Sequence, residues 1–198
     1  MAPPYGAVVL AGGQARRLGG RDKPALPVGG LPMLHRVLAA IADARPRVVV
    51  GPSRSGLPPD VVAVREEPPG GGPVAALAAG LAALPEAVPL VALLAADLPY
   101  LTPEAVASLC SAAAMSTVDG AFLVDADGRA QLLCGVWRVA ALRTRLAGLG
   151  DPAGQSMRHL VAGLPVAQVS VALAGSGPPP WYDCDTEDDL RRAEEWLG

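Results

Sequence analysis

The order of apolar segments constrains this chain more than any other feature. Short apolar runs alternate along the sequence with longer segments in which apolar residues recur at helical spacing. This alternation is typical of a parallel sheet covered by helices. Segments with the character of strands are Tyr5–Leu10, Arg47–Gly51, Val61–Arg65, Pro89–Ala95, Gly120–Val124, Gln131–Trp137 and Val166–Val171. Two of these runs, YGAVVL and PLVALLAA, are apolar throughout, as strands buried on both faces are. The sequence therefore predicts an α/β fold, a three-layer α/β/α sandwich with a mostly parallel sheet.

Helix signals lie between the strand candidates. Helices are expected at Met33–Ala44, at Gly72–Leu84, from Thr102 onward and from Thr186 to Trp196. In the first of these segments the apolar residues lie on one stripe, as packing on a sheet requires. Thr102 and Thr186 are suitable N-caps, and acidic residues follow both and complement the helix dipole.

The chain length favours one domain, residues 1–198, because a single hydrophobic core commonly serves a chain of this size. Hydrophobic residues make up 51% of the sequence, enough for a large core. Loops rich in proline and glycine separate the elements, but none is long enough to be a domain linker. We find no internal repeat at a fixed period.

Charge and cysteine usage exclude several classes of protein. The net charge of −3 argues against a general nucleic-acid binder, which shows a basic excess or stripe. The three cysteines are odd in number and lack C-x-x-C spacing, so neither a disulfide framework nor a structural zinc site is indicated. No apolar run reaches about eighteen residues, the length of a membrane span. We expect a cytoplasmic protein with no membrane partner.

A glycine-rich, basic segment follows the first strand candidate and reads LAGGQARRLGGRDKP, residues 10–24. Successive backbone N–H groups in such a loop can bind phosphate, and glycine lets the ligand approach closely. The loop matches neither G-x-x-x-x-G-K-[ST] nor G-x-G-x-x-G, the two common phosphate-binding patterns. Its arginines and lysine can nevertheless meet a triphosphate. The alternative is a turn made by glycines whose basic neighbours are merely solvated.

The spacing within this loop, L-A-G-G-x-x-x-R-x-G-G-x-D-K, resembles the signature of nucleotidyltransferases with a Rossmann-like fold. The resemblance is strongest to the molybdenum cofactor guanylyltransferases. The positions that fall on the pattern are Leu10, Ala11, Gly12, Gly13, Arg17, Gly19, Asp22 and Lys23.

Three later segments extend the resemblance over most of the chain. Family members have an acidic residue before a G-P-[LV]-[AG] turn that opens a helix, and this chain has Glu66-Glu67 before the turn G-P-V-A, residues 72–75. A strand followed by D-L-P places Asp97 where the family has its C-D-x-P aspartate. Near the C-terminus, DCDTEDDL, residues 183–190, is similar to the family's N-x-N-T-P-E-[DE]-L.

The departures from the family pattern concern both sides of the site. Asp183 and Asp185 stand where the family has asparagines, which either weakens contacts that need the amide as a donor or strengthens metal binding. The acid before G-P is either Glu66 or Glu67, and Glu67 is the residue that we assign to the nucleotide. The arginine that family members often carry before the last strand has only Arg158 as a counterpart, at an uncertain offset.

The resemblance implies a role for each matching residue. It assigns nucleotide binding to Leu10, Ala11, Gly12, Gly13, Arg17, Lys23, Glu67, Gly72 and Asp97. It assigns catalysis to Arg17, Lys23 and Asp97, and it makes Asp97 the ligand of a Mg²⁺ cofactor. It assigns binding of the acceptor substrate to Asp183 and Asp185. A simpler alternative is that the D-L-P aspartate only turns the chain and that the two C-terminal acids stabilise a helix start. Neither histidine has a partner at ligand spacing, so we assign no chemistry to His35 or His159.

The function implied is a molybdenum cofactor guanylyltransferase, which transfers GMP from GTP to molybdenum-molybdopterin and releases pyrophosphate. In the family LAGG accompanies guanine and LAAG accompanies cytosine, so Gly13 favours GTP. Transient contact with proteins that deliver or receive the cofactor is also implied. Alternatives are a molybdenum cofactor cytidylyltransferase, a transferase acting on another small-molecule phosphate, and a nucleotide-binding regulatory module without turnover.

Overall fold

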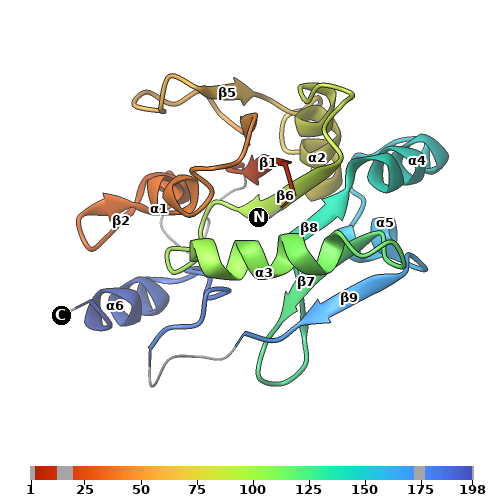
Figure 1. Ribbon diagram of the computed structural model, residues 1–198. Helices are drawn as coiled ribbons and strands as arrows, with labels where there is room; N and C mark the ends of the chain where they lie inside the picture. The colour runs from red at the N-terminus through yellow and green to blue at the C-terminus, as the bar shows by residue number, and fades with distance from the viewer. Residues whose placement is uncertain (1–2, 13–19, 172–176, 198) are drawn as a thin grey trace.

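The computed structural model describes residues 3–12, 20–171 and 177–197. Figure 1 shows a central sheet with helices on both faces. From one edge to the other the sheet contains β5 (Val61–Val64), β4 (Arg47–Val50), β1 (Tyr5–Leu10), β6 (Leu90–Ala95), β8 (Ala130–Arg138), β7 (Gly120–Val124) and β9 (Val166–Val169). Every neighbouring pair is parallel except the two pairs that contain β8. The mostly parallel sheet that the sequence predicted is confirmed.

The antiparallel direction of β8 was not predicted and follows from the turn before it. Strands β7 and β8 are joined by a short turn in which Asp125 N–H donates to the carbonyl of Arg129 at 3.1 Å. Gly128 has φ +75°, a conformation that favours glycine. A connection of this length can only return the chain alongside the strand that it left.

Helices cover the two faces of the sheet. They are α1 (Met33–Ala40), α2 (Pro73–Ala82), α3 (Pro103–Ala113), α4 (Val139–Leu149), α5 (Met157–Val161) and α6 (Glu187–Glu195). Shorter elements between β1 and α1 are the 3-10 helix η2 (Lys23–Ala25) and the hairpin of β2 (Pro27–Val28) and β3 (Leu31–Pro32). All seven expected strands are present within two residues of their predicted ends. The hairpin, η2, α4 and α5 were not foreseen.

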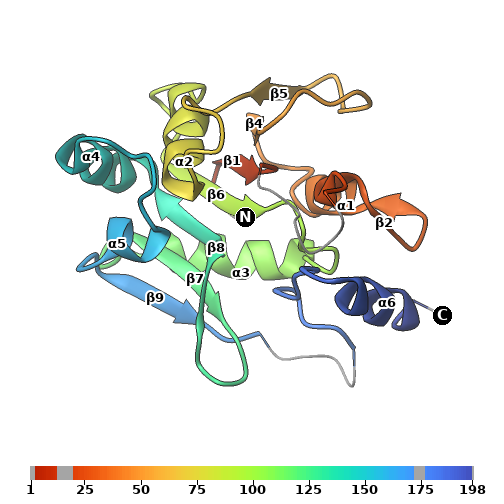
Figure 2. The ribbon, with the colours of Figure 1, turned by 180° about the vertical axis from the view of Figure 1, so that it is seen from behind.

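Alternation along the central strand divides the core into two layers. Ala7 and Val9 of β1 pack in one buried cluster with residues of α1 and α3. Val8 and Leu10 pack in the other cluster with residues of α2, α4 and α5. Figures 1 and 2 show the same division, with α3 in front of the sheet in one view and behind it in the other. The expected three-layer sandwich is thus confirmed.

A third, small cluster fixes the C-terminal helix. Val28 of the hairpin, Met33, Cys184 and Ala193 of α6 are buried together. Both views place α6 beside the hairpin, away from the middle of the sheet. The segment that precedes α6 is therefore anchored against the β2–β3 hairpin and the start of α1, although these elements lie far from it along the chain.

Within the part of the chain that the structure describes, no helix is both long and apolar enough to cross a bilayer.

Candidate active site

The carboxyl ends of β1, β4 and β6 meet at one edge of the sheet. Ala11 N–H donates to the carbonyl of Val50 at 2.7 Å, and Ala96 N–H donates to the carbonyl of Leu10 at 3.0 Å. These two hydrogen bonds continue the parallel pairing one residue beyond β1 and β6. Gly12 and Asp97 consequently begin their loops side by side, at the edge where open α/β sheets bind ligands.

A cavity of about 620 Å³ opens at this edge. Its walls come from the end of β1, the loops after β4 and β5, the start of α2, the end of β6 and one residue of β8. The lining residues are Leu10, Gly12, Pro52, Arg65, Glu66, Pro69, Gly70, Gly72, Pro73, Ala76, Ala95, Asp97 and Leu133. Four residues that the sequence assigned to the nucleotide, Leu10, Gly12, Gly72 and Asp97, are among them. The cavity volume is that of an ordinary small-molecule site.

Lys23 is held between two carboxylates at this edge. Its ammonium group forms ion pairs with Asp97 and with Asp185. Burial by itself lowers the pKa of Lys23, but the charges and hydrogen bonds of the two aspartates outweigh it and leave the pKa above its ordinary value. Lys23 is therefore a cation at neutral pH, placed where an incoming anion can compete for it.

Asp97 has one carboxylate oxygen in use and one spare. Oδ2 accepts from Lys23, while Oδ1 is buried and has no hydrogen-bond partner among the described residues. A buried acceptor without a partner is costly unless a ligand satisfies it. No group of three or more His, Cys, Asp or Glu side chains in residues 3–12, 20–171 and 177–197 is arranged to hold a metal ion. A metal at Asp97 would thus need ligands from substrate and water, which is the usual situation of Mg²⁺ at phosphate sites.

The acid that faces the cavity is Glu66, whereas we had assigned Glu67. Glu66 is 7% exposed and lines the cavity, while Glu67 is exposed and does not line it. Both acids follow β5, and of the two only Glu66 places its side chain in the cavity lining. Glu66 Oε1 accepts from Gly70 N–H at 3.0 Å, and Oε2 is buried without a partner in the described chain. The second oxygen is available to a ligand.

Residues 183–185 approach Asp97 from the C-terminal side. Cys184 N–H donates to the carbonyl of Asp97 at 3.3 Å. Loss of hydration, followed by the charges of Asp185 and Asp97, raises the pKa of Asp183. The segment ends in the predicted cap of α6, where Thr186 and Asp189 form a reciprocal capping box. Asp185 therefore lies at the Lys23–Asp97 pair, and Asp183 is two residues from it; neither lines the cavity.

Several assigned residues need separate mention. Gly13 and Arg17 lie outside the described residues. Ala11 is buried and contributes its backbone to the site without lining the cavity. Arg158 is exposed on α5.

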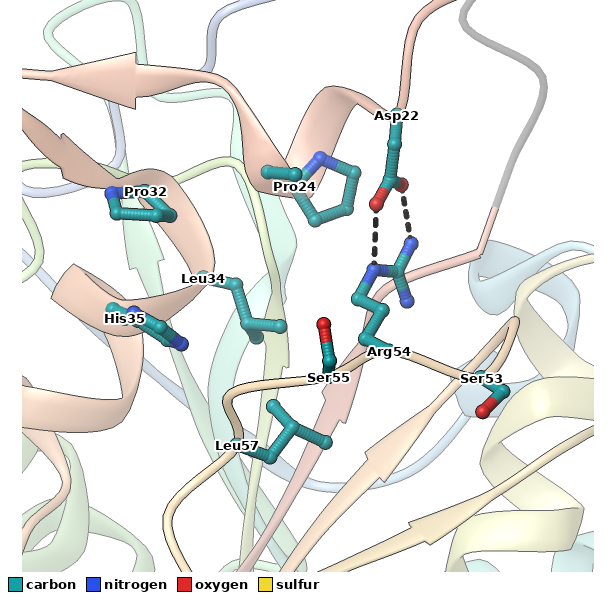
Figure 3. Close-up of a pocket in the computed structure, with 10 residues that line it drawn as sticks. Asp22, Pro24, Pro32, Leu34, His35, Ser53, Arg54, Ser55 and Leu57 are labelled. Atoms are coloured by element: carbon teal, nitrogen blue, oxygen red, sulfur yellow. Dashed lines mark hydrogen bonds and ion pairs between the residues drawn. The ribbon is translucent and has the colours of Figure 1, made fainter.

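Arg54 is the residue that sequence reasoning missed. It lies in the loop after β4, and its guanidinium binds both carboxylate oxygens of Asp22, with Nε–Oδ2 at 2.9 Å and Nη2–Oδ1 at 2.5 Å. Figure 3 shows this pair at the side of a second cavity of about 300 Å³, between α1 and the loop that carries Arg54. The signal available in the sequence was a lone arginine in GPSRSG, which the prolines and glycines marked only as a loop.

The sequence of this chain matches a known family and several named relatives. The model of the MobA-like NTP transferase domain matches residues 7–169. The chain is 33% identical over 195 residues to the molybdenum cofactor guanylyltransferase of Rhodobacter capsulatus, covering 96% of this chain and 95% of that protein. It is 39% identical over 155 residues to the probable molybdenum cofactor guanylyltransferase of Mycobacterium tuberculosis H37Rv, covering 75% and 76% of the two chains.

Among solved structures, the chain is similar to molybdopterin-guanine dinucleotide biosynthesis protein A from Archaeoglobus fulgidus. The TM-score is 0.74 at 19% identity, with 96% of this chain and 97% of that chain covered. At this identity the likeness shows the fold. The sheet and its covering helices are therefore an arrangement already known from a solved structure.

Proposed function

The chain belongs to the MobA-like NTP transferase family, and on that premise we propose that it acts as a molybdenum cofactor guanylyltransferase. It is a nucleotidyltransferase, and the relatives that match most of its length carry the guanylyltransferase name. The observation that carries the proposal is the ion pair of Lys23 with Asp97 at the cavity. It brings a phosphate-binding cation and a carboxylate suited to a metal to one point.

In the proposed reaction an oxygen of the acceptor's terminal phosphate attacks the α-phosphorus of GTP. A new P–O bond forms there, the bond between the α-phosphorus and the bridging oxygen to the β-phosphorus breaks, and pyrophosphate leaves with the electron pair. Transfer of this kind depends on in-line positioning and on neutralising charge. Lys23, and Arg17 from the same loop, would supply the positive charge.

Asp97 is the proposed ligand of Mg²⁺. Its unpartnered buried Oδ1 fits a cation, and the single carboxylate leaves room for phosphate oxygens and water. Bound Mg²⁺ supplies charge neutralisation at the reacting phosphates. Asp97 holds the ion at the end of β6, and Lys23, released from Asp97 by the incoming triphosphate, turns its ammonium group to the phosphates.

The choice of guanine is supported by Glu66. Guanine carries a ring N–H and an amino group side by side on one edge, whereas cytosine presents a single amino donor beside acceptors. The free Oε2 of Glu66 faces the cavity and accepts only. A donor-rich base edge satisfies that buried oxygen better than a mixed edge does.

Asp183 and Asp185 are the proposed acceptor contacts because their segment donates a backbone hydrogen bond to Asp97, and Asp185 pairs with Lys23. The acceptor is molybdenum-molybdopterin, delivered and taken onward by proteins that touch this edge transiently. We place the reaction in the cytoplasm. The three cysteines are free and buried, which agrees with a reducing compartment.

The test is a transfer assay with product identification. The protein is incubated with Mg²⁺, molybdenum-loaded molybdopterin and each of the four nucleoside triphosphates in turn, and the products are identified by mass. We expect a GMP adduct of the cofactor and pyrophosphate with GTP alone. A CMP adduct would transfer the assignment to a cytidylyltransferase, and the absence of any adduct would refute the proposal.

A further inference from the structure

Arg54, in the loop that follows β4, forms hydrogen bonds with both Ala11 and Asp22, which lie on either side of the glycine-rich segment. The guanidinium of Arg54 points at Asp22, as Figure 3 shows, and binds it in the two-pronged geometry that makes arginine–carboxylate pairs strong. The Arg54 side chain is only 10% exposed, whereas that of Asp22 is 47% exposed. The pair is thus fixed from the side of β4, where the arginine is packed.

Arg54 also reaches the other end of the glycine-rich segment. Its Nη2 donates to the carbonyl of Ala11 at 2.6 Å, and its Nη1 donates to the carbonyl of Pro52 at 3.2 Å. Ala11 is the first residue after β1, and Asp22 is the last residue before η2. One guanidinium therefore joins the entry and the exit of the segment that lies between them.

The positions of these two ends determine where two residues of the candidate site lie. Gly12, directly after Ala11, lines the nucleotide cavity, and Lys23, directly after Asp22, pairs with Asp97. A change in the spacing of the two ends would displace both. The arginine also balances the negative charge of Asp22, which would otherwise oppose a triphosphate next to Lys23.

We propose that Arg54 is a positioning residue that holds Ala11 and Asp22, and with them Gly12 and Lys23, in the spacing that nucleotide binding needs. The inference rests on the proposed function and extends it to a residue outside the family's loop signature. Without this clamp the ends of the loop are free to separate, and the ligand must order them when it binds. Ordering of this kind weakens the apparent affinity by the fraction of molecules that are competent, while the bound complex reacts as before.

The test compares two arginines at opposite ends of the same strand. Arg47, at the start of β4, donates to Asp60 at 2.6 Å and to the carbonyl of Leu38 at 3.1 Å, so it makes the same kind of contacts far from the loop. Arg54→Lys and Arg47→Lys each keep the charge and lose the planar guanidinium, but only Arg54→Lys removes a two-pronged contact to a carboxylate. We expect Arg54→Lys to raise the KM for GTP about tenfold with kcat within about twofold of wild type. Arg47→Lys should leave both constants unchanged.

A double-mutant cycle assigns the effect to the pair. Asp22→Asn, at a largely exposed carboxylate, should raise the KM for GTP by a similar factor. The double variant should then show no more than the larger single effect, because both changes remove one interaction. Effects that multiply, or equal KM changes in Arg54→Lys and Arg47→Lys, would overturn the proposal.

A measurement without substrate separates this inference from the proposed function. The amide protons of Ala25 and Leu26 donate to the carbonyls of Asp22 and Lys23 at 2.9 Å and 3.0 Å. In the nucleotide-free protein, hydrogen exchange at these two amides should be faster in Arg54→Lys than in wild type and unchanged in Arg47→Lys. This result stands even if the wild-type protein transfers no nucleotide. Unchanged exchange in Arg54→Lys would refute the clamp by itself.

Discussion

The ammonium group of Lys23 lies against the carboxylate of Asp97, although Lys23 begins η2, which follows β1, and Asp97 lies in the loop after β6. On the proposed function, a bound triphosphate replaces this internal ion pair by contacts to the ligand, and Lys23 then acts on the phosphates while Asp97 holds the metal. Their separate roles can be distinguished by substitution.

Asp97→Asn keeps the volume of the side chain and removes its charge. We expect turnover at saturating GTP to fall about a hundredfold or more, because groups that stabilise charge in a transition state have effects of this size. The melting temperature without ligand should change little, since the Asn oxygen can still accept from Lys23, Lys23 keeps its ion pair with Asp185, and Oδ1 contributes no hydrogen bond within the described chain. Near-normal turnover in a steady-state assay would instead place the metal at Asp183 or Asp185.

Lys23→Ala should weaken GTP binding and also lower turnover, because a phosphate contact exists in the ground state and in the transition state alike. A hydrogen bond to a charged group is worth about 1.5–3 kcal/mol, so the Kd should rise about ten- to a hundredfold. Calorimetry with Mg²⁺ and GTP measures it. Arg191→Ala is the control for net charge, since Arg191 is exposed on α6. A Kd equal to that of the control would remove Lys23 from the phosphate site.

Glu66→Gln should reduce the preference for guanine. The glutamine side chain has one acceptor oxygen and one NH₂ donor, so it cannot accept from both Gly70 N–H and the base. The affinity for GTP should therefore fall about tenfold, while that for CTP changes less. Glu67→Gln provides the neighbouring control, because Glu67 is exposed outside the cavity. The two nucleotides are compared by calorimetry. If only Glu67→Gln altered the affinity, the geometric assignment to Glu66 would be refuted.

Asp183→Asn should stabilise the protein at neutral pH. Because the folded-state pKa of Asp183 is raised above its ordinary value of 3.8, the folded state binds more protons than the unfolded state between those two values. Stability contributed by the protonated carboxyl is present below 3.8 and is lost as pH rises through the raised pKa. Urea unfolding from about pH 4 to about pH 7 should therefore show a smaller decline with pH in the variant. If stability declined with pH equally in Asp183→Asn and wild type, the raised pKa of Asp183 would be contradicted.

Gly51→Ala should disturb the start of the glycine-rich loop. A Cβ at this position would lie 2.8 Å from the carbonyl carbon and oxygen of Ala11, and φ is +153°. Overpacking of this kind costs about 1–3 kcal/mol, and here it should also raise the Kd for GTP. Gly128→Ala, with φ +75° and no atom within 4 Å of the added Cβ, should lose stability through backbone strain alone. Equal Kd values for the two variants would sink the prediction.

The sequence predicted what local pattern controls. Apolar runs located the strands, and the cap of α6 was visible in Thr186 and the acids after it. The clamp of Arg54 on Asp22 was not predictable, because it joins loops that are 32 residues apart and no periodic pattern links them. The choice of Glu66 depended on how the chain turns after β5, where Glu66 enters the cavity lining and Glu67 stays exposed. The course of such a loop is decided by the assembled fold and not by the residue types.

The C-terminal segment is attached to the rest of the fold by a small cluster of its own. Residues 183–185 depend on the cluster of Val28, Met33, Cys184 and Ala193, whereas Asp97 follows a strand at the centre of the sheet. Segments with few buried contacts open at a lower free energy than the body of a fold. We therefore expect residues 183–185 to open before Asp97 does. On the proposed function, the acceptor side would then give way first and make room for a bulky product, while the triphosphate side stays assembled for the next turnover.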